Sequence, residues 1–111
     1  MKKLVIAFGL VVLSSAVQAG GSVGWNKVTK IAFHSNGLYL YADNWSNPNG
    51  CQQVDAVVLK DSDPNYDKAY ALLLAAYMSG QRVNAYSDGC HTFDEKTYNH
   101  IRGFKYLQVT K

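Results

Sequence analysis

A single segment with a helical pattern interrupts a chain whose other apolar segments resemble strands. Asp63 is a preferred N-cap residue, and Pro64 fits the first helical turn, where its missing N–H has no cost. Gly80 is a typical left-handed helix end. The pattern predicts one helix over residues 64–79, and its place in the chain limits the choice of folds.

Three strand-like segments precede this helix and two follow it. They are residues 28–33, 38–41 and 54–59, and then residues 81–86 and 101–109. An Asn-Gly turn separates the first two, as in a tight hairpin, and a kink is expected at Gly103. Residues 43–53 and 91–100 are predicted as loops because turn-forming residues dominate the first and no clear period runs through the second.

The element order β-β-β-α-β-β predicts a mainly β fold with one helix. An OB-type five-stranded barrel requires that order in a chain of this size. An α+β sheet with one helix on its face is the alternative. Of the two, we expect the OB-fold-like barrel.

Residues 1–19 have the pattern of a secretory signal peptide. Two lysines precede an apolar run that ends at Leu13, and residues 17–19 form an Ala-x-Ala-like end. We therefore expect cleavage, a single domain over residues 20–111, and a bacterial protein that is periplasmic or secreted.

The charge of the predicted mature chain is small. The formal charge of +3 falls to +1 when the two leader lysines are removed. The longest basic cluster that remains is Lys27 with Lys30, whereas a nucleic-acid binder needs a basic stripe. No later segment has the roughly 20 apolar residues of a membrane span. We expect neither a nucleic-acid partner nor a membrane span.

Two cysteines, Cys51 and Cys90, lie in the predicted mature chain. In an oxidising compartment a pair of thiols normally forms a disulfide. A bridge between them would stabilise the fold by roughly 4 kcal/mol in the chain-entropy model. A nucleophilic Cys90 beside His91 is the alternative.

The predicted helix is apolar on every side. Residues 69–78 contain no charged and no amide side chain. Its core-facing stripe consists of Tyr66, Tyr70, Leu73 and Tyr77, with Ala69 and Ala76 beside it. The far side offers Ala71, Ala75 and Met78, where a surface helix normally carries charges. We expect this far side to be an interface with another subunit; the alternative is that alanine, a good helix former, faces water there.

Aromatic and amide residues follow one another near the first hairpin. Tyr39 and Tyr41 share one face of a predicted strand, opposite two leucines, and Asn44 and Trp45 come soon after. Aromatic rings can stack on the apolar faces of sugars, and amides can bond their hydroxyl groups. We expect these four residues to form a glycan-binding surface. The alternative is that the tyrosines pack under a loop or in a subunit interface.

Residues suited to catalysis are scattered. His34, His91 and His100 have no spacing typical of a metal site, and no glycine-rich phosphate loop is present. We expect no enzyme activity, no cofactor and no metal.

Residues 66–86 read Tyr-Asp-Lys-Ala-Tyr at the start and Tyr-Met-Ser-Gly-Gln-Arg-Val-Asn-Ala-Tyr at the end. This stretch resembles the B subunits of subtilase cytotoxin and of the pertussis-like typhoid toxin, in which an aromatic-rich helix ends in a Gly-Gln pair and enters a strand. The match is close at Tyr77, Ser79, Gly80, Gln81, Val83 and Tyr86. The resemblance implies a homopentameric ring whose helices line the centre and whose outer surfaces bind cell-surface glycans.

Together these features lead to two expectations of function. The first is a secreted or periplasmic, non-enzymatic binding module that self-associates through its helix and recognises a glycan. The second is a monomeric periplasmic accessory protein or inhibitor that binds another protein. The presence of a catalytic A subunit stays open at this point.

Overall fold

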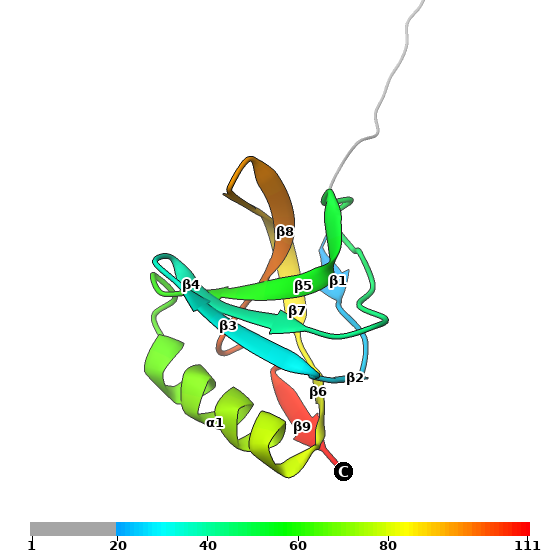
Figure 1. Cartoon of the computed structure of the whole chain (residues 1–111), viewed down its shortest axis with the longest axis vertical. Coiled ribbons are helices and arrows are strands. Elements are labelled where there is room, and N and C mark those ends of the chain that lie inside the picture. Colours follow the sequence, from blue (N-terminus) through cyan, green and yellow to red (C-terminus); the bar gives the residue numbers. More distant parts are fainter. Residues whose placement is uncertain (1–19) are drawn as a thin grey trace, which may run out of the picture.

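The computed structural model describes residues 20–111, so the predicted signal peptide lies outside the described residues. The described chain is mainly β with one helix, as predicted (Figure 1). Its elements are β1 (Gly21–Ser22), β2 (Asn26–Lys27), β3 (Lys30–His34), β4 (Gly37–Tyr41), β5 (Gln53–Lys60), α1 (Tyr66–Ser79), β6 (Arg82–Asn84), β7 (Tyr86–Phe93), β8 (Lys96–Ile101) and β9 (Gln108–Thr110).

The strands form two sheets that do not close into a barrel. One sheet has the order β1-β7-β8-β5-β4-β3, and the other has the order β2-β6-β9. Neighbouring strands are antiparallel except β5 and β8, which run parallel and are connected through α1, β6 and β7. The predicted OB-fold-like closed barrel is therefore wrong, and so is its strand order: β3 and β1 are the free edges of an open sheet.

The main source of this error is the segment predicted as a loop over residues 91–100. It forms most of the β7–β8 hairpin, whose turn residues Asp94 and Glu95 have φ angles of 53° and 64°. Such a turn needs two positive φ angles and normally contains Asn-Gly or Asp-Gly. The strand predicted over residues 101–109 is also wrong, since β8 ends at Ile101 and only β9 follows.

Helix α1 begins at Tyr66, two residues later than predicted, and ends at the predicted left-handed Gly80 (φ 70°). Asp63 does not cap the helix. Its Oδ1 accepts a hydrogen bond from the Asn65 backbone N–H (2.8 Å), and its Oδ2 accepts one from the Gly103 N–H (2.9 Å). No helix within residues 20–111 is long and apolar enough to cross a bilayer.

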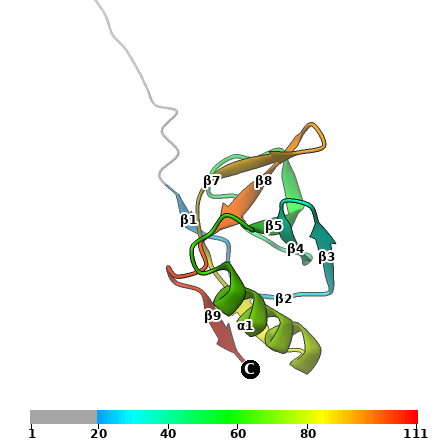
Figure 2. The ribbon, with the colours of Figure 1, turned by 90° about the vertical axis from the view of Figure 1, so that its left-hand side faces the viewer.

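The hydrophobic core lies between α1 and the sheets. The helix contributes Ala69, Leu73 and Ala76, with its tyrosines packed at the margin, which confirms the predicted core-facing stripe. The strands and loops contribute Val23, Val28, Leu38, Leu40, Ala42, Trp45, Val57, Leu59, Val83, Ala85 and Ile101. Figure 2 shows α1 and β9 side by side at one end of the molecule, with the β7–β8 hairpin at the other.

The other face of β4 is covered as well. Tyr39 points away from the helix and contacts Phe93 and Tyr98 of the β7–β8 hairpin, with ring centroids 5.2 Å and 5.5 Å away. The ring of His34 lies 4.7 Å from both Tyr39 and Phe93. Strand β4 is therefore buried on both faces, so Tyr39 does not lie on the protein surface.

Candidate functional site

The four residues predicted to bind a glycan do not form a common surface. Tyr39 is fully buried, and Trp45 is 6% exposed. The indole Nε1 of Trp45 donates a hydrogen bond to the Leu40 carbonyl (3.0 Å). The prediction that Tyr39 faces outward is wrong, because it assumed that β4 has one solvated face, and Trp45 is too deeply buried to stack on a glycan.

Tyr39 is also fully engaged at its hydroxyl group, which donates to Oδ1 of Asn36 (2.9 Å). Burial raises the pKa of Tyr39 to about 12, although the hydrogen bond with Asn36 acts in the opposite direction. Tyr41 is half-buried, with Nζ of Lys30 4.4 Å from its ring centroid, and Asn44 is exposed. Only the last two could meet a ligand.

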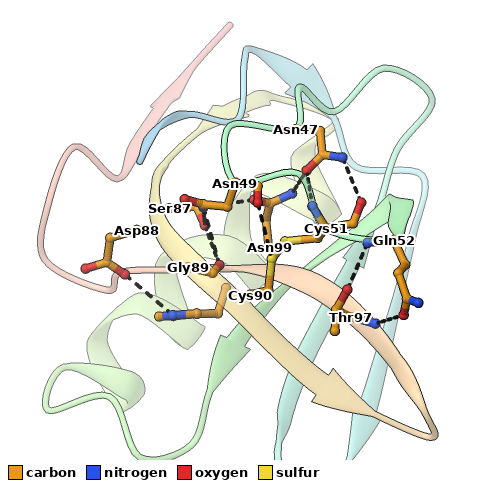
Figure 3. The surroundings of a disulfide bond; sticks show 11 residues. Asn47, Asn49, Cys51, Gln52, Ser87, Asp88, Gly89, Cys90, Thr97 and Asn99 are labelled. Atoms are coloured by element: carbon orange, nitrogen blue, oxygen red, sulfur yellow. Dashed lines mark hydrogen bonds and ion pairs between the residues drawn. A yellow bond between two sulfur atoms is a disulfide. The ribbon is translucent and has the colours of Figure 1, made fainter. Parts of the chain in front are cut away.

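The asparagine-rich loop after β4 is used to hold the chain together around the disulfide. The predicted bridge between Cys51 and Cys90 is confirmed, with Cα atoms 5.7 Å apart (Figure 3). Asn47 accepts a hydrogen bond from the Cys51 N–H and donates one to the Cys51 carbonyl, both at 2.8 Å. Because both sulfur atoms are in the bridge, Cys90 has no thiol to act as a nucleophile.

Further side-chain hydrogen bonds of asparagine join this loop to β7 and β8. Asn49 Nδ2 donates to Ser87 Oγ (2.9 Å) and to Asn99 Oδ1 (3.0 Å), and Asn99 Nδ2 donates to Asn47 Oδ1 (2.8 Å) (Figure 3). Asn49, Ser87 and Asn99 are all buried. Their side chains therefore fix the loop and do not form a ligand surface.

A different set of aromatic and polar residues surrounds a hollow of about 260 Å³. It is lined by Ser22 of β1, Asn84, Ala85 and Tyr86 at the β6–β7 junction, and Tyr106 and Gln108 near β9. We call this hollow the Tyr86–Tyr106 site. It combines aromatic walls with a few polar groups, which is the usual make-up of a small-ligand site.

The two rings of the site pack edge to face against each other and form adjoining walls. Their centroids are 6.0 Å apart, and their planes are inclined by 63°. Tyr106 is 65% exposed, and its φ angle is 56°. A bulky residue rarely adopts this left-handed conformation, which costs of the order of 1–3 kcal/mol and is concentrated at functional sites. Nζ of Lys105 lies 4.2 Å from the centroid of Tyr86 and so occupies one side of that ring.

The polar side of the site is held in one orientation. Asn84 Oδ1 accepts hydrogen bonds from Ser22 Oγ (2.6 Å) and from the Ala85 N–H (2.9 Å). Ser22 Oγ in turn accepts one from the Gly24 N–H (3.0 Å). These contacts leave the amide nitrogen of Asn84 to donate to a ligand, and the side chain of Gln108 is exposed beside it.

Sequence patterns do not single out this site. Tyr86 lies at the end of the strand predicted over residues 81–86, and Tyr106 lies within the segment predicted as the last strand. The one available signal was Gly103, which marks the break where the chain leaves β8 and exposes Phe104 and Tyr106.

The predicted interface residues lie on the outward side of α1. Ala71 and Ala75 are exposed, and Met78 is 75% exposed. Leu72 and Leu74 extend the same apolar surface, with exposed fractions of 41% and 36%. We call these five residues the outer helix face. It is apolar, as the sequence indicated.

The side chains of the three histidines have different nearest partners. His34 stacks on Phe93, His91 Nε2 is 2.6 Å from Asn36 Nδ2, and His100 Nε2 is 3.5 Å from Asp88 Oδ1. Within residues 20–111, no group of three or more His, Cys, Asp or Glu side chains could hold a metal ion.

Comparisons with known proteins give no further guide. No protein-family model matches the chain, and no curated protein and no solved structure is significantly similar to it.

Proposed function

We propose that this protein is an exported, non-enzymatic binding module that recognises glycans at the Tyr86–Tyr106 site. The observation that carries the proposal is the arrangement of two angled tyrosine rings beside a fixed amide and an exposed one. The leader pattern of residues 1–19 supports export, and the disulfide is of a kind found in oxidising compartments.

The chemistry of the site suits a sugar ring. Tyrosine has an apolar ring with a polar tip, so it can cover the C–H face of a sugar and still bond a hydroxyl group. Asn84 can donate through its free amide nitrogen, and Gln108 can both donate and accept. The volume of about 260 Å³ is just below the usual range of ligand pockets, which favours one or two sugar units over a long chain.

A glycan array probed with the oxidised protein tests this proposal, followed by titration calorimetry with the strongest ligand. Tyr106→Ala should reduce the affinity at least tenfold because it removes the more exposed wall. Phe104→Ala is the matched control, since Phe104 is 57% exposed in the same segment but does not line the site. A protein that binds no glycan on the array, or equal losses in both variants, would contradict the proposal.

We further propose that the module self-associates through the outer helix face. A helix that is apolar all round is normally buried, and this face exposes Leu72, Leu74 and Met78 to solvent in the single chain. The homopentamer implied by the resemblance to toxin B subunits, with or without an A subunit, is one form that such an assembly would take.

Sedimentation velocity at micromolar concentration tests the assembly. Ala75→Lys should dissociate it, because a charge without a partner would be buried in the interface. Ser35→Lys adds the same charge in the exposed turn between β3 and β4 and should have no effect. If the unaltered protein sediments as a monomer, self-association is refuted, and the outer helix face then favours the second function, an accessory protein or inhibitor that docks another protein there.

A further inference from the structure

A second hollow, of about 190 Å³, lies at the opposite end of the parallel strand pair from the disulfide loop. Leu59 of β5 pairs with Ile101 of β8, so the chain leaves both strands at the same edge of the sheet. Lys60 and Arg102 are the next residues, and both line the hollow. In open α/β sheets, ligands commonly bind outside the carboxyl ends of the parallel strands, and this strand pair offers the same local geometry.

The hollow presents hydrogen-bond donors from three elements. Lys60 comes from the end of β5, His100 and Arg102 come from β8 and the residue after it, and Ser62 comes from the loop before α1. Asp63 also lines it, but its side chain is 5% exposed, and both of its oxygens already accept backbone hydrogen bonds. Asp63 therefore anchors the loop and offers little acceptor capacity to a ligand.

The two cations at the hollow differ in their partners. Arg102 is paired with Asp88, with Nη1 and Oδ2 2.6 Å apart, and its Nε is 3.9 Å from Asp63. Lys60 forms no ion pair within residues 20–111. Of the two cations, Lys60 is thus the one without a carboxylate partner in this part of the chain, and Arg102 is held in place beside it.

The positive charge of Lys60 affects the pKa of two nearby histidines, His91 and His100. Burial lowers the pKa of His100, and Lys60 lowers it further; Asp88 opposes this effect, while Arg102 and His91 add to it. The pKa of His91 is also lowered by burial and then by Lys60, against the opposing effect of Asp61. At both rings the effect of Lys60 on the pKa is larger than that of the opposing carboxylate, so an anion bound beside Lys60 would favour protonation of the histidines.

We propose that this hollow binds a phosphate or sulfate group, with Lys60 and Arg102 as charged donors and Ser62 and His100 as further donors. The site is separate from the Tyr86–Tyr106 site and does not depend on glycan recognition. The anion is either free in solution or a substituent of a larger molecule, since both present the same oxygen atoms. His100 donates most strongly when protonated, so binding strengthens as the pH falls.

Isothermal titration of the oxidised protein with sodium sulfate, sodium phosphate and glycerol phosphate, at constant ionic strength set with chloride, tests the site. We expect saturable binding, and a higher affinity for sulfate at pH 5.5 than at pH 8, because sulfate keeps its charge over this range. Tighter binding of glycerol phosphate than of phosphate would assign the anion to a larger ligand, and the reverse would assign it to the free ion.

Variants separate specific binding from general charge effects. Lys60→Gln should weaken sulfate binding about tenfold, the effect of losing one charged hydrogen bond. Lys105→Gln removes the same charge over Tyr86, away from the hollow, and should leave the affinity unchanged. In two-dimensional NMR spectra, the signals of His100 should shift with added sulfate. Absence of saturable binding by all three anions, or equal weakening by both variants, would overturn the proposal.

Discussion

Two pairs of aromatic residues in this protein occupy opposite environments. Tyr39 and Trp45 lie in β4 and the loop after it, are almost fully buried, and each has its polar atom in a hydrogen bond. Tyr86 and Tyr106 lie outside the core, in contact with each other beside a hollow, and Tyr106 is 65% exposed. Whether a ring can meet a ligand therefore depends on what packs over its part of the chain, more than on the residue type.

The largest expected effect concerns the buried pair. Trp45→Ala should lower the free energy of unfolding by about 3–5 kcal/mol, because it leaves a cavity in the core. Trp25→Ala is the matched control: Trp25 is 41% exposed and contacts Arg82, so its loss should cost less than about 1 kcal/mol. Guanidinium unfolding curves measure both. Similar losses of unfolding free energy in the two variants would contradict the claim that the buried Trp45 stabilises the fold more than the exposed Trp25.

Removal of the disulfide should have the next largest effect. In the double variant Cys51→Ala/Cys90→Ala, the hydrogen bonds of Asn49 with Ser87 and Gly89 still join the loop to β7, but the covalent link is lost. We expect a loss of about 2–5 kcal/mol in the free energy of unfolding. An unchanged denaturation midpoint relative to the oxidised protein would mean that the amide network alone fixes this loop.

Acidification should have a smaller effect, through His91 and His100. Burial and Lys60 lower the pKa of both below the usual 6.5, so the unfolded chain binds protons more readily than the folded one. The stability due to these two groups is complete above about pH 6.5 and falls as the pH drops below that value. Urea unfolding at a series of pH values measures it. The variant His91→Gln/His100→Gln should show a shallower loss; an equal slope would assign the acid sensitivity to other groups.

The smallest expected effect on stability belongs to the exposed pair. Tyr106→Ala should change the free energy of unfolding by no more than about 0.5 kcal/mol, as is usual for surface positions, although it removes one wall of the Tyr86–Tyr106 site. Thermal unfolding by circular dichroism measures the difference. A loss comparable to that of Trp45→Ala would mean that Tyr106 is part of the core and that the two pairs do not differ.

Local patterns predicted the parts of the fold that depend on neighbouring residues. The helix, its end at Gly80 and its core-facing stripe follow from spacing along the chain, and the strands before it follow from alternation and the Asn-Gly turn. The disulfide follows from the number of cysteines and the expected compartment.

Contacts between segments that are far apart in the sequence could not be predicted in the same way. The Asp94–Glu95 turn adopts two positive φ angles without glycine, so the β7–β8 hairpin carried no turn signal. That hairpin covers Tyr39, which alternation alone had assigned to solvent. Tyr86 and Tyr106 come together only because the chain turns back after β8, a contact over 20 positions that no local pattern reports.

The most direct test of the account is to locate the bound glycan on the protein. In a titration of the isotope-labelled, oxidised protein with the strongest ligand from the array, the largest amide shifts should occur at Ser22, Asn84, Tyr86, Tyr106 and Gln108. Shifts centred instead on Tyr41 and Asn44, with those five residues unchanged, would contradict the assignment of the site.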